Sequence, residues 1–324
     1  MEKPLITRSD TMREIILAPG ESLQSAINAL PQDDSPVLLR LQAGEYREKI
    51  EIRRPHTTIV GADMGQTILT WDDGANDIHP DGQKRGTFRS YTMLVLADHC
   101  SLQNLTIRNE AGQRADSGQC VALFADGDDF RCENCELIST QDTLFTAPLP
   151  PKEVIPGGFL GPTQLLPRKA QCHVYRGCTI RGDVDFIYGG AAAWFEDCNI
   201  VCIPRDGRTP GGYCTAASTP EGQKYGYVFK NCRFTGENVL DASFYLGRPW
   251  REHARTILLD CYIGPHISPE GWDNWGKPDF MNKGFYAEYG CFGPGSNTAK
   301  RAYAHVLTAE EAAHITCDDF MNSL

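Results

Sequence analysis

The sequence lacks the features of several common functional classes. Its 324 residues carry a formal net charge of −11, so there is no basic excess of the kind that nucleic-acid-binding proteins show. No apolar run is long enough to cross a bilayer, and the first residues, MEKPLITRSDTMREI, contain no apolar core of signal-peptide length. We therefore expect no nucleic-acid partner and no membrane partner. An acidic ligand stays possible because a local cationic site can lie on an acidic protein.

A zinc-binding pattern is also missing. Cys132 and Cys135 form a CxxC, but no second CxxC and no pair of histidines accompanies it. The 13 cysteines are an odd number, which does not suggest a disulfide framework. Most of them lie in strand-like runs, and free cysteine is among the most buried residue types. We interpret them as small apolar core residues and expect no metal site.

A short phrase recurs along the chain and indicates a solenoid. A polar residue or glycine is followed by a small residue, one spacer and an aliphatic or aromatic residue in NLTI (104–107), NCEL (134–137), GCTI (177–180), DCNI (197–200), NCRF (231–234) and DCYI (260–263). The irregular spacing is typical of stacked coils with loops of variable length between strands. Helical periodicity is nearly absent between residues 45 and 300. We predict an all-β protein, a parallel β-helix forming a single domain over residues 1–324.

Helices are predicted only near the two ends, where a solenoid needs caps. The stretch 21–31 reads as a short amphipathic helix with Ser22 as its N-cap and Pro31 as its stop. The stretch 307–320 reads as a C-terminal helix, because Thr308 and Glu311 fit a capping box. The Pro- and Gly-rich segment 146–170 is predicted to be a long inserted loop. It is either functional or a variable surface insertion.

Four stretches contain candidate catalytic residues: GQCVALF (118–124), STQDTLF (139–145), GDVDFIYGG (182–190) and YLGRPW (245–250). Taken singly, each is a weak indication, since a strand Gln is usually a surface residue and Arg-Pro-Trp can be a turn. Aspartate is depleted in strands and rarely buried unless paired, so Asp185 is difficult to explain as packing. Stacked coils of a β-helix bring distant residues together. One face can then gather Gln119, Gln141, Asp142, Asp185, Arg248 and Trp250.

The four stretches resemble, in the same order, sequence blocks of the pectin methylesterases (pectinesterases, carbohydrate esterase family 8), which read approximately QAVAL, QDTL, DFIFG and LGRPW. Further similarity lies in residues 41–52, 86–95, 104–112 and 271–295, so the resemblance covers nearly the whole chain. The family's fold is a right-handed parallel β-helix, which agrees with the repeat. The resemblance implies hydrolysis of galacturonate methyl esters in pectin or oligogalacturonides, with release of methanol and without a cofactor.

The resemblance also implies roles for the two aspartates and the arginine. Asp185 is the nucleophile that forms an acyl-enzyme, and Asp142 is the general acid and later the general base. Arg248 lowers the pKa of Asp185 and keeps it charged. A nearby Asp185 and partial burial are expected to raise the pKa of Asp142.

The amides and aromatic residues complete the implied site. Gln119 and Gln141 stabilise the oxyanion with their side-chain N–H groups. Trp250 offers a face to a sugar ring. Thr87, in the block GTFRSYTMLV, is a further substrate contact. Tyr188 stands where the family usually has Phe and either contacts the substrate or packs in the core.

Three features depart from the family's pattern. Asp183 replaces the usual Thr and is expected to be structural or solvent-facing; a cleft-facing Asp183 would instead disfavour an anionic substrate. Cys120 replaces the usual Ala. The 146–170 loop follows directly on QDTLF, so we expect it to border the site and to limit the length of the substrate.

Other classes of function compete with an esterase. A serine hydrolase is disfavoured, because there is no GxSxG elbow and none of the eight histidines lies in the four stretches. A polysaccharide lyase or glycoside hydrolase also fits a β-helix with two carboxylates. A carbohydrate-binding solenoid without activity would not need the Asp-Asp-Arg set.

The cysteines bear on cellular location. Free thiols suit a reducing compartment, so our hypothesis is a cytoplasmic enzyme that acts on imported oligogalacturonides. The alternative is a secreted enzyme whose signal peptide is not part of this sequence. Several disulfide bridges in protein from its native source would contradict the cytoplasmic hypothesis.

Overall fold

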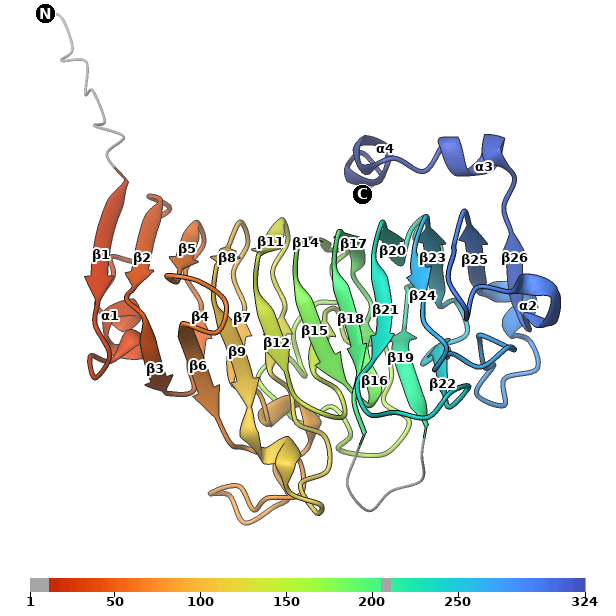
Figure 1. Cartoon of the computed structure of the whole chain (residues 1–324). Helices are drawn as coiled ribbons and strands as arrows, with labels where there is room; N and C mark the ends of the chain where they lie inside the picture. Colours follow the sequence, from red (N-terminus) through yellow and green to blue (C-terminus); the bar gives the residue numbers. More distant parts are fainter. Residues whose placement is uncertain (1–11, 205–210, 324) are drawn as a thin grey trace, which may run out of the picture.

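The computed structural model describes residues 12–204 and 211–323 and shows a parallel β-helix (Figure 1). Three long sheets run side by side along the molecule, and neighbouring strands within each sheet come from successive coils. Pairing is parallel, as in β11 with β14, β12 with β15 and β13 with β16. The all-β, β-helical prediction is confirmed.

The coils from β2 to β22 each contribute one strand to each sheet, and sheet A continues beyond them at both ends. Sheet A contains β1 (Arg13–Leu17), β2 (Val37–Leu41), β5 (Thr57–Val60), β8 (Ser101–Gln103), β11 (Phe130–Glu133), β14 (Cys172–Arg176), β17 (Ala192–Glu196), β20 (Tyr227–Lys230), β23 (Arg255–Leu259), β25 (Phe285–Tyr289) and β26 (Ala304–Val306). Sheet B contains β3 (Gly44–Arg47), β6 (Thr67–Trp71), β9 (Thr106–Asn109), β12 (Glu136–Ile138), β15 (Thr179–Gly182), β18 (Asn199–Cys202), β21 (Arg233–Gly236) and β24 (Tyr262–Ile263). Sheet C contains β4 (Ile50–Ile52), β7 (Met93–Val95), β10 (Leu123–Ala125), β13 (Leu144–Thr146), β16 (Val184–Gly189), β19 (Gly212–Ala217) and β22 (Phe244–Gly247).

The recurring phrase of the sequence is the corner between sheets A and B. Its first residue has left-handed backbone in every coil, with φ between 50° and 59°; these residues are Asn104, Asn134, Gly177, Asp197, Asn231 and Asp260. Glycine, asparagine and aspartate adopt this conformation at the lowest cost, which explains why the position is restricted to them. The next residue is buried, and in five of these six coils it is a cysteine. The repeat therefore encodes a turn and an inward core position.

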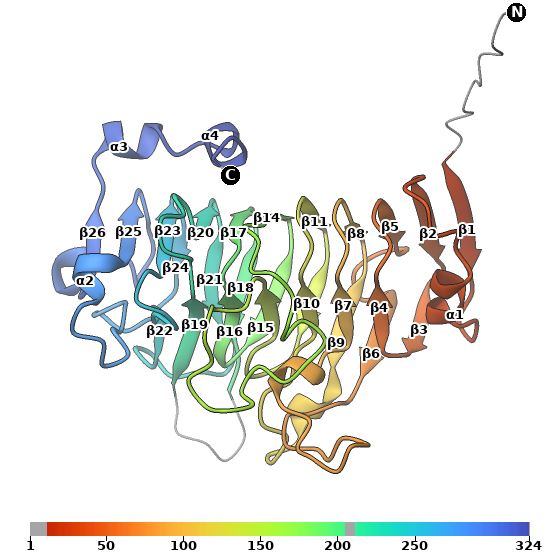
Figure 2. The ribbon, with the colours of Figure 1, turned by 180° about the vertical axis from the view of Figure 1, so that it is seen from behind.

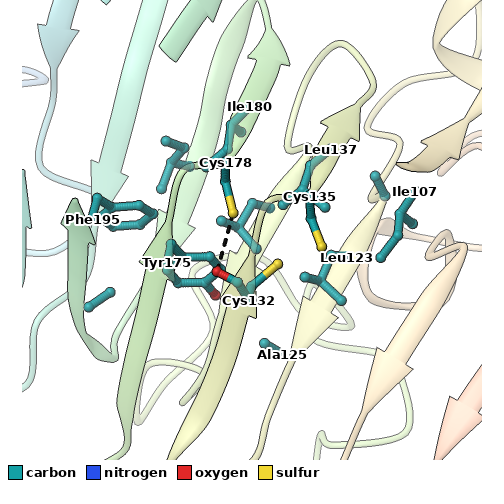
Figure 3. Packing of buried hydrophobic residues seen from close by; sticks show 14 of the residues in the cluster. Ile107, Leu123, Ala125, Cys132, Cys135, Leu137, Tyr175, Cys178, Ile180 and Phe195 are labelled. Atoms are coloured by element: carbon teal, nitrogen blue, oxygen red, sulfur yellow. Dashed lines mark hydrogen bonds between the residues drawn. The ribbon is translucent and has the colours of Figure 1, made fainter. Parts of the chain in front are cut away.

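The interior is a narrow column of stacked side chains (Figure 3). Tyr175 and Phe195 stack face to face on neighbouring coils, with ring centroids 4.7 Å apart. The Cys178 thiol donates to the carbonyl oxygen of Cys132 on the preceding coil at 3.2 Å. All 13 cysteines are free, and all but Cys291 and Cys317 are buried. The interpretation of the cysteines as core residues is confirmed for the buried ones.

Short helices lie at both ends. In α1 (Leu23–Asn28), the Ser22 side chain accepts the N–H of Ser25 as predicted, and Leu23 packs into the core. The other helical segments are α2 (Phe280–Lys283), α3 (Ala309–Ala313), α4 (Cys317–Met321) and the 3₁₀ turns η1 (Thr87–Arg89), η2 (Glu110–Gln113) and η3 (Thr298–Lys300). Within the described residues, no helix has the length and hydropathy of a membrane span.

The C-terminal helix differs from its prediction. The capping box of Thr308 and Glu311 is present, but the predicted single helix 307–320 is two short helices. The chain breaks because Thr316 takes an extended conformation and caps α4 with its side chain. Phe320 of α4 packs on Trp194 of sheet A, with ring centroids 5.5 Å apart. The segment therefore lies along the outer side of sheet A (Figure 1).

A buried ion pair holds the last coils together. Arg301 donates its Nε–H to Glu288 Oε1 at 2.8 Å, and both side chains are only 2% exposed. The indole N–H of Trp272 donates to the same oxygen at 2.9 Å. One carboxylate thus satisfies donors from two loops and fixes both against β25.

Replacing Glu288 by alanine is expected to lower the free energy of unfolding by about 3–5 kcal/mol, because it leaves a buried guanidinium without a counter-charge. Urea titration followed by circular dichroism measures this change. The matched control is Glu14→Ala, whose partner Arg40 is exposed, with both side chains close to half accessible. Loss of that surface pair is expected to cost at most about 1 kcal/mol. Equal effects at the two positions would contradict a structural role for the buried pair.

Candidate active site

The polar stretches meet because sheet C stacks them in register. Leu144 pairs with Ile187, and Asp142 and Asp185 each lie two residues before these partners. The two aspartates therefore occupy equivalent places on neighbouring coils, and the Asp142 N–H donates to the Val184 carbonyl oxygen at 3.1 Å. The Cys120 N–H donates to the Gln141 carbonyl oxygen at 3.0 Å, which places the glutamine stretches side by side as well.

A cavity of about 370 Å³ opens over this part of sheet C. All eight residues predicted from the sequence to form the site line it. Its lining consists of Thr87, Phe88, Gln119, Gln141, Asp142, Val154, Ile155, Gly158, Phe159, Asp185, Tyr188, Ala216, Arg248, Trp250, Arg251 and Trp275. The structure thus brings together residues that are up to 188 positions apart in the sequence, from Thr87 to Trp275.

Both aspartates have left-handed backbone, with φ of 67° at Asp142 and 50° at Asp185. The pairing of β16 with β19 shifts register between Val184 and Ile187, so Asp185 lies in a bulge. A bulge re-aims a side chain that would otherwise follow the strict alternation of a strand. Non-glycine residues in this conformation are uncommon and tend to cluster at functional sites. The local backbone therefore explains how strand residues reach the cavity.

Asp185 and Arg248 form a two-pronged ion pair. Arg248 donates Nε–H to Oδ1 and Nη2–H to Oδ2, each at 2.8 Å. Burial raises the pKa of Asp185, and the hydrogen bonds and charge of Arg248 act in the opposite direction. The net pKa lies above the ordinary value, so the predicted lowering is wrong in its net direction. Arg248 acts as expected, but desolvation of a carboxylate with a 9% exposed side chain outweighs it.

Two aromatic rings hold the guanidinium of Arg248. Its Cζ lies 3.9 Å from the ring centroid of Tyr213 and 3.7 Å from that of Trp275. Cation–π contacts of this kind on both sides fix the plane of the guanidinium and thus the direction of its hydrogen bonds. Neither ring was singled out from the sequence. The available signal was that Trp275 lies in the 271–295 stretch that resembles the family.

One wall of the cavity is aromatic. The Tyr188 ring packs against Phe145 with centroids 4.8 Å apart and against Trp250 at 5.7 Å. Tyr188 is 3% exposed, and its hydroxyl has no hydrogen-bond partner among the described residues. It therefore both packs and lines the cavity, while Trp250 remains partly exposed at the rim. Phe88, which also lines this wall, was not predicted from the sequence.

The long segment between β13 and β14 also lines the cavity. In Figure 2 this yellow-green chain lies in front of the strands of sheet C. Four of its residues line the cavity, and Phe159 packs edge-on against Phe88 at 5.8 Å and Trp250 at 6.1 Å. The exposed Val154 and Ile155 also line the cavity. Phe159 therefore fixes this segment against the aromatic residues of the site.

Asp183 does not line the cavity. It is 2% exposed, and its Oδ1 accepts the N–H of Val184 at 2.7 Å. Of the two expectations for this residue, the structural one fits and the solvent-facing one is wrong. Within residues 12–204 and 211–323, no group of three or more metal-ligating side chains is close enough to hold an ion.

Comparisons with known proteins place the chain in a family. The pectinesterase family model matches residues 19–149 and 164–323, so the chain belongs to the pectinesterase family. The internal unmatched residues, 150–163, belong to the segment that lines the cavity.

Relatives and solved structures agree with this assignment. A probable pectinesterase/pectinesterase inhibitor from Arabidopsis thaliana is 31% identical over 87% of this chain and 45% of its own length. Pectinesterase 31 of the same plant is 31% identical over 93% of this chain and 88% of its own length. The chain spans about half the length of the first curated relatives that it matches, at 45% and 55%.

Two solved structures of pectin methylesterases show the same fold. The enzyme PemA from Erwinia chrysanthemi superposes with a TM-score of 0.80 at 26% identity, covering 97% of this chain and 98% of its own. A pectin methylesterase in complex with a hexasaccharide superposes with a TM-score of 0.78 at 27% identity, covering 94% of this chain and 93% of its own.

Proposed function

We propose that this protein is a pectin methylesterase that hydrolyses galacturonate methyl esters in pectin or oligogalacturonides and releases methanol. The observation that carries the proposal is the Asp185–Arg248 ion pair next to Asp142 in one cavity of a pectinesterase-family chain. The hexasaccharide bound to a related enzyme supports an oligosaccharide as the ligand.

The arrangement supports an acyl-enzyme mechanism. An Asp185 carboxylate oxygen attacks the ester carbonyl carbon and forms a tetrahedral intermediate. When this collapses, the bond to the methoxy oxygen breaks, and Asp142 donates the proton that makes methanol. The product on the enzyme is an anhydride. Asp142, now ionised, takes a proton from water, whose hydroxide attacks the anhydride and frees the galacturonate carboxylate and Asp185.

Gln119, Gln141 and Trp250 have supporting roles in this mechanism. Amide N–H groups aimed at the developing oxyanion stabilise the transition state, and one such donor is worth about 3 kcal/mol. The partly exposed indole of Trp250 presents an apolar face to a sugar ring. Arg248 holds the nucleophile in position through both carboxylate oxygens, which leaves it little rotational freedom.

The proposed activity is tested by following two products from the same reaction. Wild-type enzyme is incubated with methyl-esterified oligogalacturonides and with polymeric pectin, and methanol and chain length are measured. We expect methanol with chains of unchanged length. Shortened chains without methanol would instead indicate a lyase or glycoside hydrolase. If neither methanol nor shortened chains formed, a carbohydrate-binding protein without activity would be favoured. Faster turnover of short substrates than of polymer is expected, since the 146–170 segment walls the site.

A further inference from the structure

A buried asparagine contacts the glutamine stretch of the site from outside the cavity. Asn109 is the last residue of β9, and only 2% of it is exposed. Its Oδ1 accepts the N–H of Ala111 at 3.0 Å and so caps the turn η2. Asn109 does not line the catalytic cavity, and no step of the proposed mechanism uses it. An amide buried this deeply must be satisfied by hydrogen bonds, so its partners show what it holds.

The amide nitrogen of Asn109 joins three segments of the chain. Its Nδ2–H groups donate to the carbonyl oxygens of Asp73 at 3.0 Å, Ser90 at 2.6 Å and Val121 at 3.0 Å. The nitrogen carries two hydrogens, so two of the three oxygens share one of them. These partners are backbone groups between 12 and 36 positions away in the sequence. Asn109 therefore fixes the course of the main chain in three places at once.

Two of the three segments hold the peptide of Gln119. Ala75, two residues after Asp73, donates its N–H to the Gln119 carbonyl oxygen at 2.9 Å. Val121, whose carbonyl oxygen Asn109 contacts, follows Gln119 by two residues. The main chain at Gln119 thus lies between two segments that the same amide group holds. The direction in which the Gln119 side chain enters the cavity depends on this main chain.

The turn that carries Thr87 has local hydrogen bonds of its own. Ser90 is fully buried, and both its N–H and its hydroxyl donate to the Thr87 carbonyl oxygen, at 3.1 and 2.7 Å. These bonds do not involve Asn109. The Ser90 hydroxyl also accepts the N–H of Val121 at 3.2 Å, a longer contact, whereas Asn109 binds the carbonyl group of Val121. Loss of the Asn109 amide is therefore expected to displace Gln119 more than Thr87.

We propose that Asn109 is a positioning residue that holds Gln119 in the direction needed to stabilise the oxyanion. This inference rests on the proposed esterase function. An oxyanion donor is effective only when it lies about 3 Å from the oxygen atom that becomes charged, so a small displacement of the Gln119 amide weakens this contact in the transition state. The ester carbonyl of the bound substrate carries far less charge, so ground-state binding suffers less. The expected signature is a loss of kcat with little change in KM.

Asn109→Ser tests this role with a small change. Serine is a favoured helix N-cap and keeps an acceptor for Ala111, but its single short donor cannot reach three carbonyl oxygens. We expect kcat for methanol release to fall about tenfold and KM to change by less than about threefold. The decisive comparison repeats Asn109→Ser in a Gln119→Ala background, where the amide that Asn109 positions is already absent. Relative to Gln119→Ala alone, kcat should then fall by less than about twofold, because residues that act as a unit are not additive.

The matched control is Tyr46→Phe, in the N-terminal part of the solenoid. The buried Tyr46 hydroxyl also donates to two backbone carbonyl oxygens, those of Leu17 at 2.8 Å and Gln42 at 3.1 Å. This variant should lower the thermal midpoint, measured by circular dichroism, and leave kcat and KM as in wild type. All rates are measured well below the lowest thermal midpoint of the set, so that each variant is compared in its folded state.

The possible outcomes separate the positioning role from the esterase function. An unchanged kcat in Asn109→Ser would overturn the role of Asn109, and so would an equal loss of kcat with and without Gln119. A wild-type kcat in Gln119→Ala would overturn it as well, because Gln119 would then not act on the oxyanion. Each of these results leaves the esterase intact, since methanol is still released. Absence of methanol from wild type would overturn the esterase itself.

Discussion

Asp185→Ala is expected to lower kcat for methanol release by at least about 10⁴-fold, because no neighbouring group replaces a missing nucleophile. Asp142 is the other carboxylate in the cavity, but in the proposed mechanism its proton is needed by the leaving methoxy group. In Asp185→Ala, water would have to attack the ester directly, without the covalent intermediate that divides the reaction into two easier steps. The measurement is methanol release at saturating substrate, with circular dichroism to compare folded content.

Asp185→Asn separates chemistry from structure. Alanine leaves the partly buried Arg248 without either of its carboxylate contacts, so a loss of stability accompanies it. Asparagine keeps the size of the side chain and one acceptor for Arg248 but is a far weaker nucleophile. Both variants should show the same collapse of kcat, while alanine should lower the thermal midpoint more than asparagine does. Activity of Asp185→Asn within about tenfold of wild type would exclude Asp185 as the nucleophile.

Much of the fold was predictable because each coil repeats the same local requirement. The corner between sheets A and B needs left-handed backbone, and only a few residue types meet that need cheaply. Asn134 and Asp197 therefore mark coils even where the loops between them differ in length. The C-terminal helix was predicted with the wrong length because Thr316 is equally compatible with the inside of a helix and with an N-cap. Phe320 of α4 packs on Trp194 of sheet A, and that contact is not local in sequence.

The site was predictable in its residues but not in its energetics. The stacking of coils explains why the two aspartates come together. The other site residues were predicted from the order of the motifs and their resemblance to the family. The net pKa of Asp185 was not predictable, because it depends on how much water the surrounding coils and the loop segment exclude. The two aromatic rings that contact the Arg248 guanidinium were not predicted, for a related reason. Tyr213 and Trp275 reach it from other coils, and no spacing rule links them in the sequence.

Arg248→Lys is expected to reduce kcat/KM by roughly 10²–10³-fold and to move the acid limb of its pH profile to higher pH. Burial raises the pKa of Asp185, and Arg248 is the largest influence that lowers it. Lysine keeps one charge but makes a single contact, so the pKa of Asp185 rises further. The nucleophile must be ionised, and its ionised fraction at a given acidic pH then falls. The profile of kcat/KM against pH for the free enzyme measures this shift.

The direction of the shift distinguishes pKa control from simple positioning. If Arg248 only oriented the carboxylate, Arg248→Lys would lower kcat/KM equally at every pH and leave the acid limb in place. Arg248→Met removes the charge entirely and should move the limb further than lysine does, since the desolvation of Asp185 is then unopposed by its nearest cation. Lys277 also lowers the pKa of Asp185, although less than Arg248 does. The expected order of the acid limbs is therefore wild type lowest, Arg248→Lys next and Arg248→Met highest, and any other order would contradict control of the Asp185 pKa by Arg248.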